Sequence, residues 1–142
     1  MSGRITMLNP VPVEWAAKKQ AQTADSPAAA EITAIRDAVA AGRQFVWRAR
    51  DAGMQIEEPV CIHTDSKQGI SFAEATCLCS KMGGVFDRKE AWVRELRDAG
   101  KVKLMKIPTA ENPADLMTKP FTGGKFQKMV KWILGGGPVR ET

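Results

Sequence analysis

Three acidic residues are spaced so that an α/β fold could bring them to one metal site. Glu31 falls among the apolar positions of a long amphipathic helix, Asp65 ends an apolar strand, and Asp115 opens a short helix. Burying an acid is costly unless something compensates its charge, and a divalent cation is one common compensation. The three carboxylates therefore predict metal-assisted cleavage of a phosphodiester, a reaction that two cations about 3.5–4 Å apart can promote.

Each acid also has a structural interpretation. Glu31 could be a helix-surface acid that pairs with a neighbouring basic residue. Asp65 could cap the following helix, although acids at strand ends in α/β sheets also lie where ligands bind. The dipole of its own helix could stabilise Asp115. Ser66 is interpreted as a turn or cap residue, and the single histidine, His63, as a packing residue in its strand.

Hydrophobic periodicity and stop signals predict the elements that position the acids. Apolar runs at residues 4–8 and 11–15 predict a hairpin. A helix is predicted from Pro27 to Ala52, with Ser26 as N-cap and Gly53 as the stop. The apolar face of this helix is formed by Ala28, Ile35, Ala38, Val39, Phe45 and Val46.

The second half of the chain continues the alternation of strands and helices. The apolar strand over residues 59–64 is predicted to be central and covered on both faces. Helices are predicted over 66–80, over 86–99, after the cap at Asn112-Pro113 and over 126–134, with a strand over 102–107 whose buried face is ambiguous. This order predicts one mixed α/β domain over residues 1–142, with a flexible tail at 135–142.

The charge balance favours a polyanionic partner. The net charge is +5 and the pI is near 9.3, which suits nucleic acid but also an ordinary basic surface. Six lysines could contact phosphates, although solvated charge is the favoured interpretation for most of them: Lys18, Lys19, Lys119, Lys125, Lys128 and Lys131. The four tryptophans are predicted to lie in the core rather than to stack on bases: Trp15, Trp47, Trp92 and Trp132.

The cysteines and the hydropathy pattern predict a location inside the cell. Cys61, Cys77 and Cys79 are too few and too irregular for a disulfide framework, so reduced thiols are predicted. No apolar run approaches membrane-spanning length, and the N-terminus lacks the apolar segment of a signal peptide. The compartment is left open between cytoplasm and nucleus.

Four motifs resemble, in order, those of one family. Trp15-Ala-Ala-Lys-Lys-Gln20 is similar to W-x-S-K-K-Q, and Ser26-Pro-Ala-Ala-Ala-Glu-Ile-Thr-Ala-Ile35 to S-T-A-E-A-E-Y-x-A-L. Thr64-Asp-Ser66 resembles C-D-N or T-D-S, and the fourth motif is Ile107-Pro-Thr-Ala-Glu-Asn-Pro-Ala-Asp-Leu-Met-Thr-Lys-Pro120, similar to V-P-T-x-x-x-x-A-D-x-L-T-K-P. Over about residues 4–134, the chain thus resembles the ribonuclease H domain of copia-type LTR retrotransposon polyproteins.

The resemblance implies a fold, an activity and a site. The family has a mixed five-stranded sheet with helices on both faces. It cleaves the RNA strand of RNA–DNA hybrids with two divalent metal ions, Mg²⁺ or Mn²⁺, held by four acids. By their positions in the motifs, Glu31, Asp65 and Asp115 correspond to three of these four acids. The implied partner is an RNA–DNA hybrid or another nucleic acid.

The chain also departs from the family. The family's first aspartate lies on an opening strand, in a stretch like D-A-D-W-A-G, that has no counterpart here. Ala29 replaces the upstream glutamate of the helix motif, and Gly84-Val-Phe-Asp87 replaces K-H-I-D. We therefore expect a ribonuclease H-like sheet that lacks its first strand. We also expect that catalysis by this domain is impaired and that its metal binding could be lost. The alternative hypothesis is a domesticated, non-catalytic subunit of a larger assembly, in which a partner protein completes the sheet.

Overall fold

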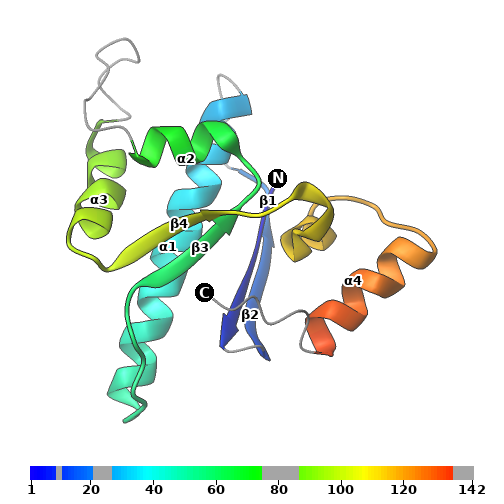
Figure 1. Cartoon of the computed structure of the whole chain (residues 1–142), viewed down its shortest axis with the longest axis horizontal. Helices are drawn as coiled ribbons and strands as arrows, with labels where there is room; N and C mark the ends of the chain where they lie inside the picture. The colour runs from blue at the N-terminus through cyan, green and yellow to red at the C-terminus, as the bar shows by residue number, and fades with distance from the viewer. Residues whose placement is uncertain (9–10, 21–26, 75–86, 136–142) are drawn as a thin grey trace. The chain divides into compact units, whose positions relative to one another are not determined.

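The computed structural model describes residues 1–8, 11–20, 27–74 and 87–135 (Figure 1). Its elements are β1 (Ser2–Leu8), β2 (Val11–Lys18), α1 (Pro27–Asp51), β3 (Val60–Thr64), α2 (Lys67–Glu74), α3 (Asp87–Asp98), β4 (Val102–Lys106), the 3₁₀ helices η1 (Thr109–Glu111) and η2 (Pro113–Met117), and α4 (Gly124–Leu134). This order of strands and helices confirms the one predicted from the sequence. Several predicted features lie outside the described residues: the Ser26 cap, the hairpin turn, the helix beyond residue 74, Cys77, Cys79, Phe86 and the tail from residue 136.

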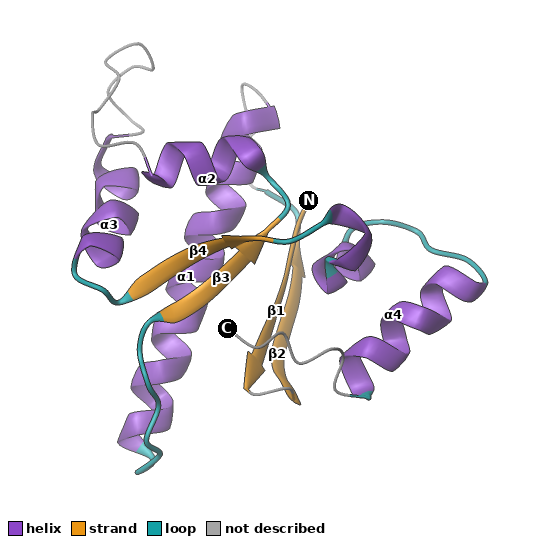
Figure 2. Cartoon of the chain, viewed as in Figure 1, coloured by secondary structure: helices purple, strands orange, loops and turns teal. Residues whose placement is uncertain are grey.

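The described strands form two small sheets (Figure 2). β1 and β2 pair in antiparallel orientation, and β3 and β4 pair in parallel, with Ile62 opposite Leu104. The chain divides into a terminal unit (residues 1–24 and 108–142) and a central unit (residues 25–107), which are described separately below. This mixed α/β architecture is compatible with a ribonuclease H-like fold. The ribonuclease H-like sheet that lacks the family's first strand and the single domain stay predictions.

The core of the central unit lies where α1, α3 and the β3–β4 sheet meet. Ile35 and Val39 of α1, Ile62 of β3, and Val93 and Val102 form one buried cluster. Trp92 and Leu96 pack against this cluster, which confirms the predicted inward face of α3. On β4, the face that carries Val102 and Leu104 is the packed one, whereas Lys103 is exposed, so the structure resolves an ambiguity in the strand's sequence.

Strand β3 is covered on one face, contrary to the prediction of two covered faces. Ile62 is buried, but Cys61 and His63, which point to the opposite face, are exposed. Alternate residues of a strand point to opposite faces, and the face that carries Ile62 is the one that packs with Ile35 and Val39 of α1. The interpretation of His63 as a packing residue is therefore wrong as well.

Glu58 ties the end of α1 to the starts of both parallel strands. It accepts hydrogen bonds from Arg43 of α1 and from Lys101 Nζ (2.7 Å), and Arg50 Nη1 lies 3.5 Å from it. Only 14% of the Glu58 side chain is exposed. The hydrogen bond from Lys101 holds the pKa of Glu58 below its usual value, desolvation opposes this effect, and Arg43 lowers the pKa further. This ion-pair cluster fixes the segment that leads into β3.

Two helices of the central unit end at their predicted glycine stops. Gly53 and Gly100 have positive φ angles of 84° and 69°. The next residue in each case donates to a carbonyl five residues earlier, Met54 N to Ala49 O (2.9 Å) and Lys101 N to Leu96 O (2.8 Å). These bonds satisfy carbonyl groups that a helix end would otherwise leave without partners.

The terminal unit contains the predicted hairpin, which packs against η2 and α4. Three apolar residues on one face of β2 are exposed, Val11 by 58%, Val13 by 37% and Trp15 by 63%. Trp47 of α1, in the central unit, is 68% exposed. The prediction of a core position is therefore wrong for both of these tryptophans, whereas Trp92 and Trp132 are half-buried.

None of the helices in the described ranges is long and apolar enough to cross a membrane.

Candidate metal site

Glu31 lies in the second turn of α1 and is exposed, so its predicted core-facing position is wrong. The buried positions of α1 include Ala29, Ile35 and Val39, and Glu31 lies between the first two of them in the sequence. At this position the carboxylate remains open to solvent at the margin of the contact between α1 and α2. Because Glu31 is exposed, its negative charge does not need a cation to compensate a cost of burial.

Ser66 connects Glu31 to the turn that follows β3. The Ser66 hydroxyl donates a hydrogen bond to Glu31 Oε2 and accepts one from the backbone N–H of Gly69 (2.9 Å). Ser66 N–H in turn donates to Thr64 Oγ1 (3.2 Å). Only 8% of Ser66 is exposed. The structure thereby brings Glu31 to the residue next to Asp65.

Asp65 follows the last residue of β3 and is half-buried. Its position directly after the strand confirms the sequence prediction. Ser66 occupies the position just before α2, and its hydroxyl accepts a hydrogen bond from Gly69 N–H, as an N-cap does.

Asp115 lies in the terminal unit, and its carboxylate has a basic partner. Lys119 Nζ is 2.7 Å from Asp115 Oδ2, and Asp115 is only 9% exposed. The predicted cap is confirmed, since Asn112 Oδ1 accepts from Ala114 N–H (3.1 Å) at the start of η2. Lys119 thus compensates the negative charge of the buried Asp115 carboxylate, a role that the sequence predicts for a divalent cation.

The structure brings together two of the three predicted acids. Glu31 and the Asp65–Ser66 turn meet in the central unit. Asp115 belongs to the terminal unit, so the structure does not define its distance from the other two acids. Within the described ranges, no group of three or more His, Cys, Asp or Glu side chains is arranged to hold a metal ion. Two carboxylates with water and substrate phosphate can hold Mg²⁺, so the donor set around Ser66 fits one weakly held cation.

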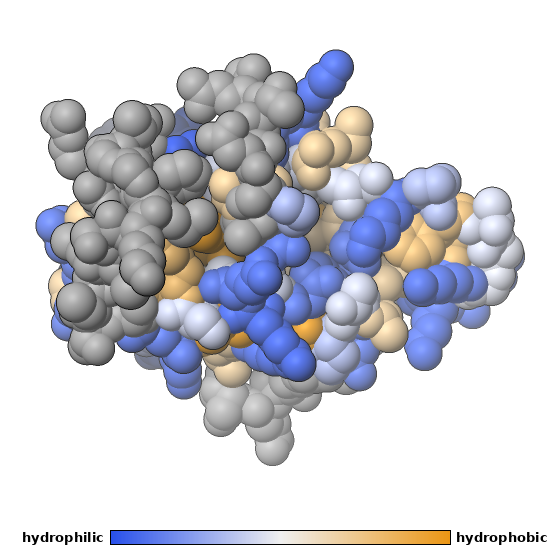
Figure 3. Space-filling model, turned by 90° about the horizontal axis from the view of Figure 1, so that it is seen from above, coloured by the Kyte–Doolittle hydropathy of each residue, from blue (hydrophilic) through white to orange (hydrophobic). Residues whose placement is uncertain are grey.

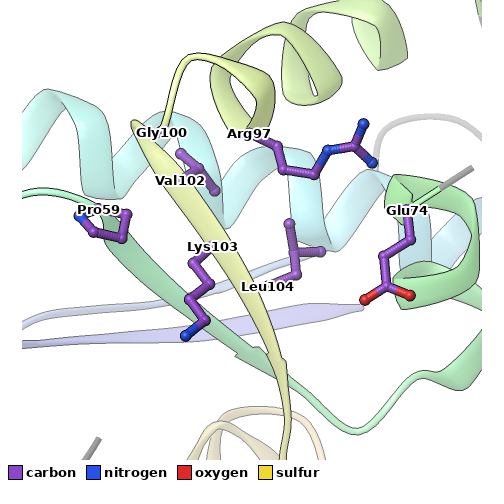
Figure 4. Close-up of a pocket in the computed structure, with 7 residues that line it drawn as sticks. All are labelled: Pro59, Glu74, Arg97, Gly100, Val102, Lys103 and Leu104. Atoms are coloured by element: carbon purple, nitrogen blue, oxygen red, sulfur yellow. The ribbon is translucent and has the colours of Figure 1, made fainter. Parts of the chain in front are cut away.

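An open pocket of about 380 Å³ lies elsewhere in the central unit (Figure 4). Its lining comprises Pro59, Glu74, Arg97, Gly100, Val102, Lys103 and Leu104. The Arg97 side chain already donates to Ala73 O and to Asp98 (2.7 Å). Neither Glu31 nor Asp65 lines this pocket, so it is not the predicted site.

The positive charge of the chain is concentrated in the terminal unit. Lys and Arg outnumber Asp and Glu by four in this unit and by one in the central unit. Helix α4 carries three exposed lysines, Lys125, Lys128 and Lys131, and no acidic residue. Hydrophilic and apolar side chains are interspersed on the face of the described residues shown in Figure 3.

Two contacts in the structure go beyond what the sequence predicts for their residues. The turn or cap role of Ser66 is confirmed, but its bond to Glu31 connects residues 35 positions apart and has no local sequence signal. Lys119 is not the solvated charge that the sequence favours. Its spacing of four residues from Asp115 is the signal that indicates an ion pair.

One relative supports an origin of this chain in a retrotransposon polyprotein. Over 126 residues the chain is 30% identical to the "Retrovirus-related Pol polyprotein from transposon TNT 1-94" of Nicotiana tabacum. The match covers 87% of this chain but only 9% of the polyprotein. No protein-family model matches the chain, and no solved structure does.

Proposed function

We propose that this chain is a ribonuclease H-like segment of a copia-type retrotransposon polyprotein, with an ancestral activity on the RNA strand of RNA–DNA hybrids. The observation that carries the proposal is the hydrogen bond between Ser66 and Glu31, which brings two motif acids, Glu31 and Asp65, to the same place. The similarity to a retrotransposon Pol polyprotein supports the same assignment.

The roles of the residues follow from this geometry and from the motifs. Glu31 and Asp65 would hold a divalent cation, Mg²⁺ or Mn²⁺, beside the scissile phosphate, and the motif match assigns the same role to Asp115. Such a cation supplies Lewis acidity toward a phosphate oxygen when bound. Lys119 would compete with a cation for the Asp115 carboxylate, since its ammonium group is 2.7 Å from that carboxylate.

The residues of this chain supply three of the family's four acids, so we expect impaired catalysis by residues 1–142 alone. Three carboxylates carry a formal charge of −3 against +4 for two cations, which favours one weakly held ion over a pair. Loss of one ligand removes several kcal/mol of transition-state stabilisation, and each 1.36 kcal/mol corresponds to about a tenfold change in rate.

Cleavage of a labelled RNA–DNA hybrid in Mg²⁺ or Mn²⁺ tests this proposal. We expect slow cleavage that falls further in the Asp65→Asn variant. Extension of the chain by an upstream strand with the D-A-D-W segment is expected to raise the rate. Robust turnover by the unextended chain, abolished by Asp65→Asn, would contradict impairment. Equal background cleavage by wild type, variant and extended chain would contradict the ancestral activity.

A nucleic-acid partner is part of the same proposal. The excess of positive charge in the terminal unit and the lysines of α4 suit a phosphate backbone. Phosphate contacts of this kind do not depend on sequence and weaken with salt.

A second candidate is a domesticated, non-catalytic subunit that a partner protein completes. The exposed apolar residues Val11, Val13 and Trp15 on one face of β2 favour it, because a row of exposed apolar side chains is typical of an interaction surface. Co-purification of one protein at a stoichiometric ratio, abolished in the Trp15→Ser variant, would support this candidate. A stable and monodisperse monomer would count against it.

A further inference from the structure

Ser66 is placed between two structural elements that carry the proposed metal ligands. It follows Asp65 directly in sequence, and its hydroxyl contacts Glu31 of α1. With 8% exposure it is one of two buried polar residues in the described parts of the chain. A hydroxyl in such a position has a fixed set of partners, because water does not compete for its hydrogen bonds.

The directions of the two hydrogen bonds of the Ser66 hydroxyl are determined by chemistry. The backbone N–H of Gly69 can only donate, so Ser66 Oγ accepts from it (2.9 Å). The single hydroxyl hydrogen is then available for Glu31 Oε2. Hydrogen bonds in a chain polarise one another, so the amide of α2 strengthens the bond that holds the carboxylate.

Close packing keeps α1 and α2 at the separation that this bond requires. A Cβ atom on Gly69 would overlap Cδ1 of Ile35 and would lie 3.2 Å from Ser66 Oγ. Ile35 is one turn beyond Glu31 on α1. The absence of a side chain at Gly69 therefore permits the contact through which Ser66 reaches the carboxylate.

We propose that Ser66 is a positioning residue, whose hydroxyl fixes the Glu31 carboxylate beside Asp65 in the geometry that binds a divalent cation. This inference rests on the proposed function. Glu31 is exposed, so without Ser66 its side chain would sample several rotamers. Oε2 accepts from Ser66, and Oε1 remains the oxygen available to a cation. Removing a partner that orients a metal ligand typically costs 10–100-fold in affinity.

The test measures Mn²⁺ affinity by electron paramagnetic resonance of the free ion, so it does not depend on catalysis. We expect Ser66→Ala to weaken Mn²⁺ binding about tenfold, and Ser66→Thr, which keeps the hydroxyl, to restore most of the affinity. Ser71→Ala is the matched control, because Ser71 is an exposed serine of α2, the helix that begins directly after Ser66. In a Glu31→Gln background, Ser66→Ala should cause no further loss. Circular dichroism at the titration temperature establishes that each variant is folded.

The outcomes separate this inference from the proposed function. If Glu31→Gln and Asp65→Asn weaken Mn²⁺ binding but Ser66→Ala does not, the metal site stands and the positioning role of Ser66 is wrong. The same conclusion follows if Ser66→Ala weakens binding equally with and without Glu31→Gln. If the wild type binds Mn²⁺ no better than the Glu31→Gln, Asp65→Asn double variant, the metal site itself is wrong, and the role of Ser66 falls with it.

Discussion

Gly69 of α2 lies against the Cδ1 atom of Ile35 on α1, so closely that any side chain at position 69 would overlap it. Both residues are buried. The contact sets how near α2 approaches α1, and the Ser66–Glu31 hydrogen bond lies one turn away along α1. Packing at one point thus determines the geometry of a polar contact at another.

Gly69→Ala is expected to destabilise the chain, although alanine favours a helix. Overpacking a core costs about 1–3 kcal/mol, and the gain in helix propensity offsets about 0.5–1 kcal/mol. We expect a net loss of about 1 kcal/mol in the free energy of unfolding, measured by urea denaturation. Ile35→Val removes the overlapping Cδ1 atom, so Gly69→Ala should cost less in that background, with a coupling energy of at least about 0.5 kcal/mol. Strictly additive effects would show that the two residues do not collide.

Glu58 makes stability depend on pH in the acidic range. Its pKa is lowered in the folded chain, mainly by the hydrogen bond from Lys101. Its contribution to stability is therefore present above the usual value of 4.5 and is lost as the pH falls through the lower, folded value. As the pH falls from 4.5 through this lower value, the urea midpoint of the wild type should drop more steeply than that of Glu58→Gln. The matched control, Glu57→Gln, alters an exposed neighbour and should keep the wild-type profile, and identical profiles for all three would contradict the role of Glu58.

Lys119→Met should destabilise the terminal unit, because it leaves the buried Asp115 carboxylate without its ion pair. We expect a loss of about 1 kcal/mol, since the exposure of Lys119 reduces the larger cost of breaking a buried pair. The side chains of Lys119 and Asp115 are 52% and 12% exposed. If Asp115 also binds a cation, Mn²⁺ should raise the melting temperature of the variant more than that of the wild type. An unchanged unfolding free energy would show that the ion pair contributes nothing.

Paired substitutions of exposed lysines test which unit binds nucleic acid. Lys128→Gln with Lys131→Gln should lower the slope of log K against log salt for an RNA–DNA hybrid, by about 1 for each phosphate that the variant no longer neutralises. Lys103→Gln with Lys106→Gln removes the same charge from β4 in the central unit. A slope for Lys128→Gln with Lys131→Gln that equals the wild-type slope would mean that these lysines of α4 are only solvated charge.

Local patterns predict the elements well, because the residues that decide them are close in sequence. Gly53 and Gly100 end helices in the structure as their positions predict. The alternation of β4 leaves two possible buried faces, and packing with Val93 of α3 selects the face that carries Val102. Asn112 caps η2 as its sequence indicates. For the two glycines and for Asn112, the stabilising contact spans a few residues.

Exposure is harder to predict, because it depends on which faces find partners. The apolar strand over residues 59–64 predicts two covered faces, yet Cys61 and His63, which alternate with the buried Ile62, are exposed. Trp47 has the hydropathy of a core residue, but it is 68% exposed although its neighbour Val46 on α1 is buried. Glu31 falls within the apolar face by periodicity and still reaches solvent, although Ala29 before it and Ile35 after it on α1 are both buried.

Gly42 in the middle of α1 has a consequence for any attempt to strengthen this helix. A Cβ at position 42 would lie 2.8 Å from Cγ1 of Val60 on β3, so the residue that weakens the helix on its own lets it lie close to the strand. A peptide of residues 27–51 with alanine at this site would gain helicity in isolation. The same change in the whole chain would force helix and strand apart, so local propensity and tertiary fit make opposite demands on this residue.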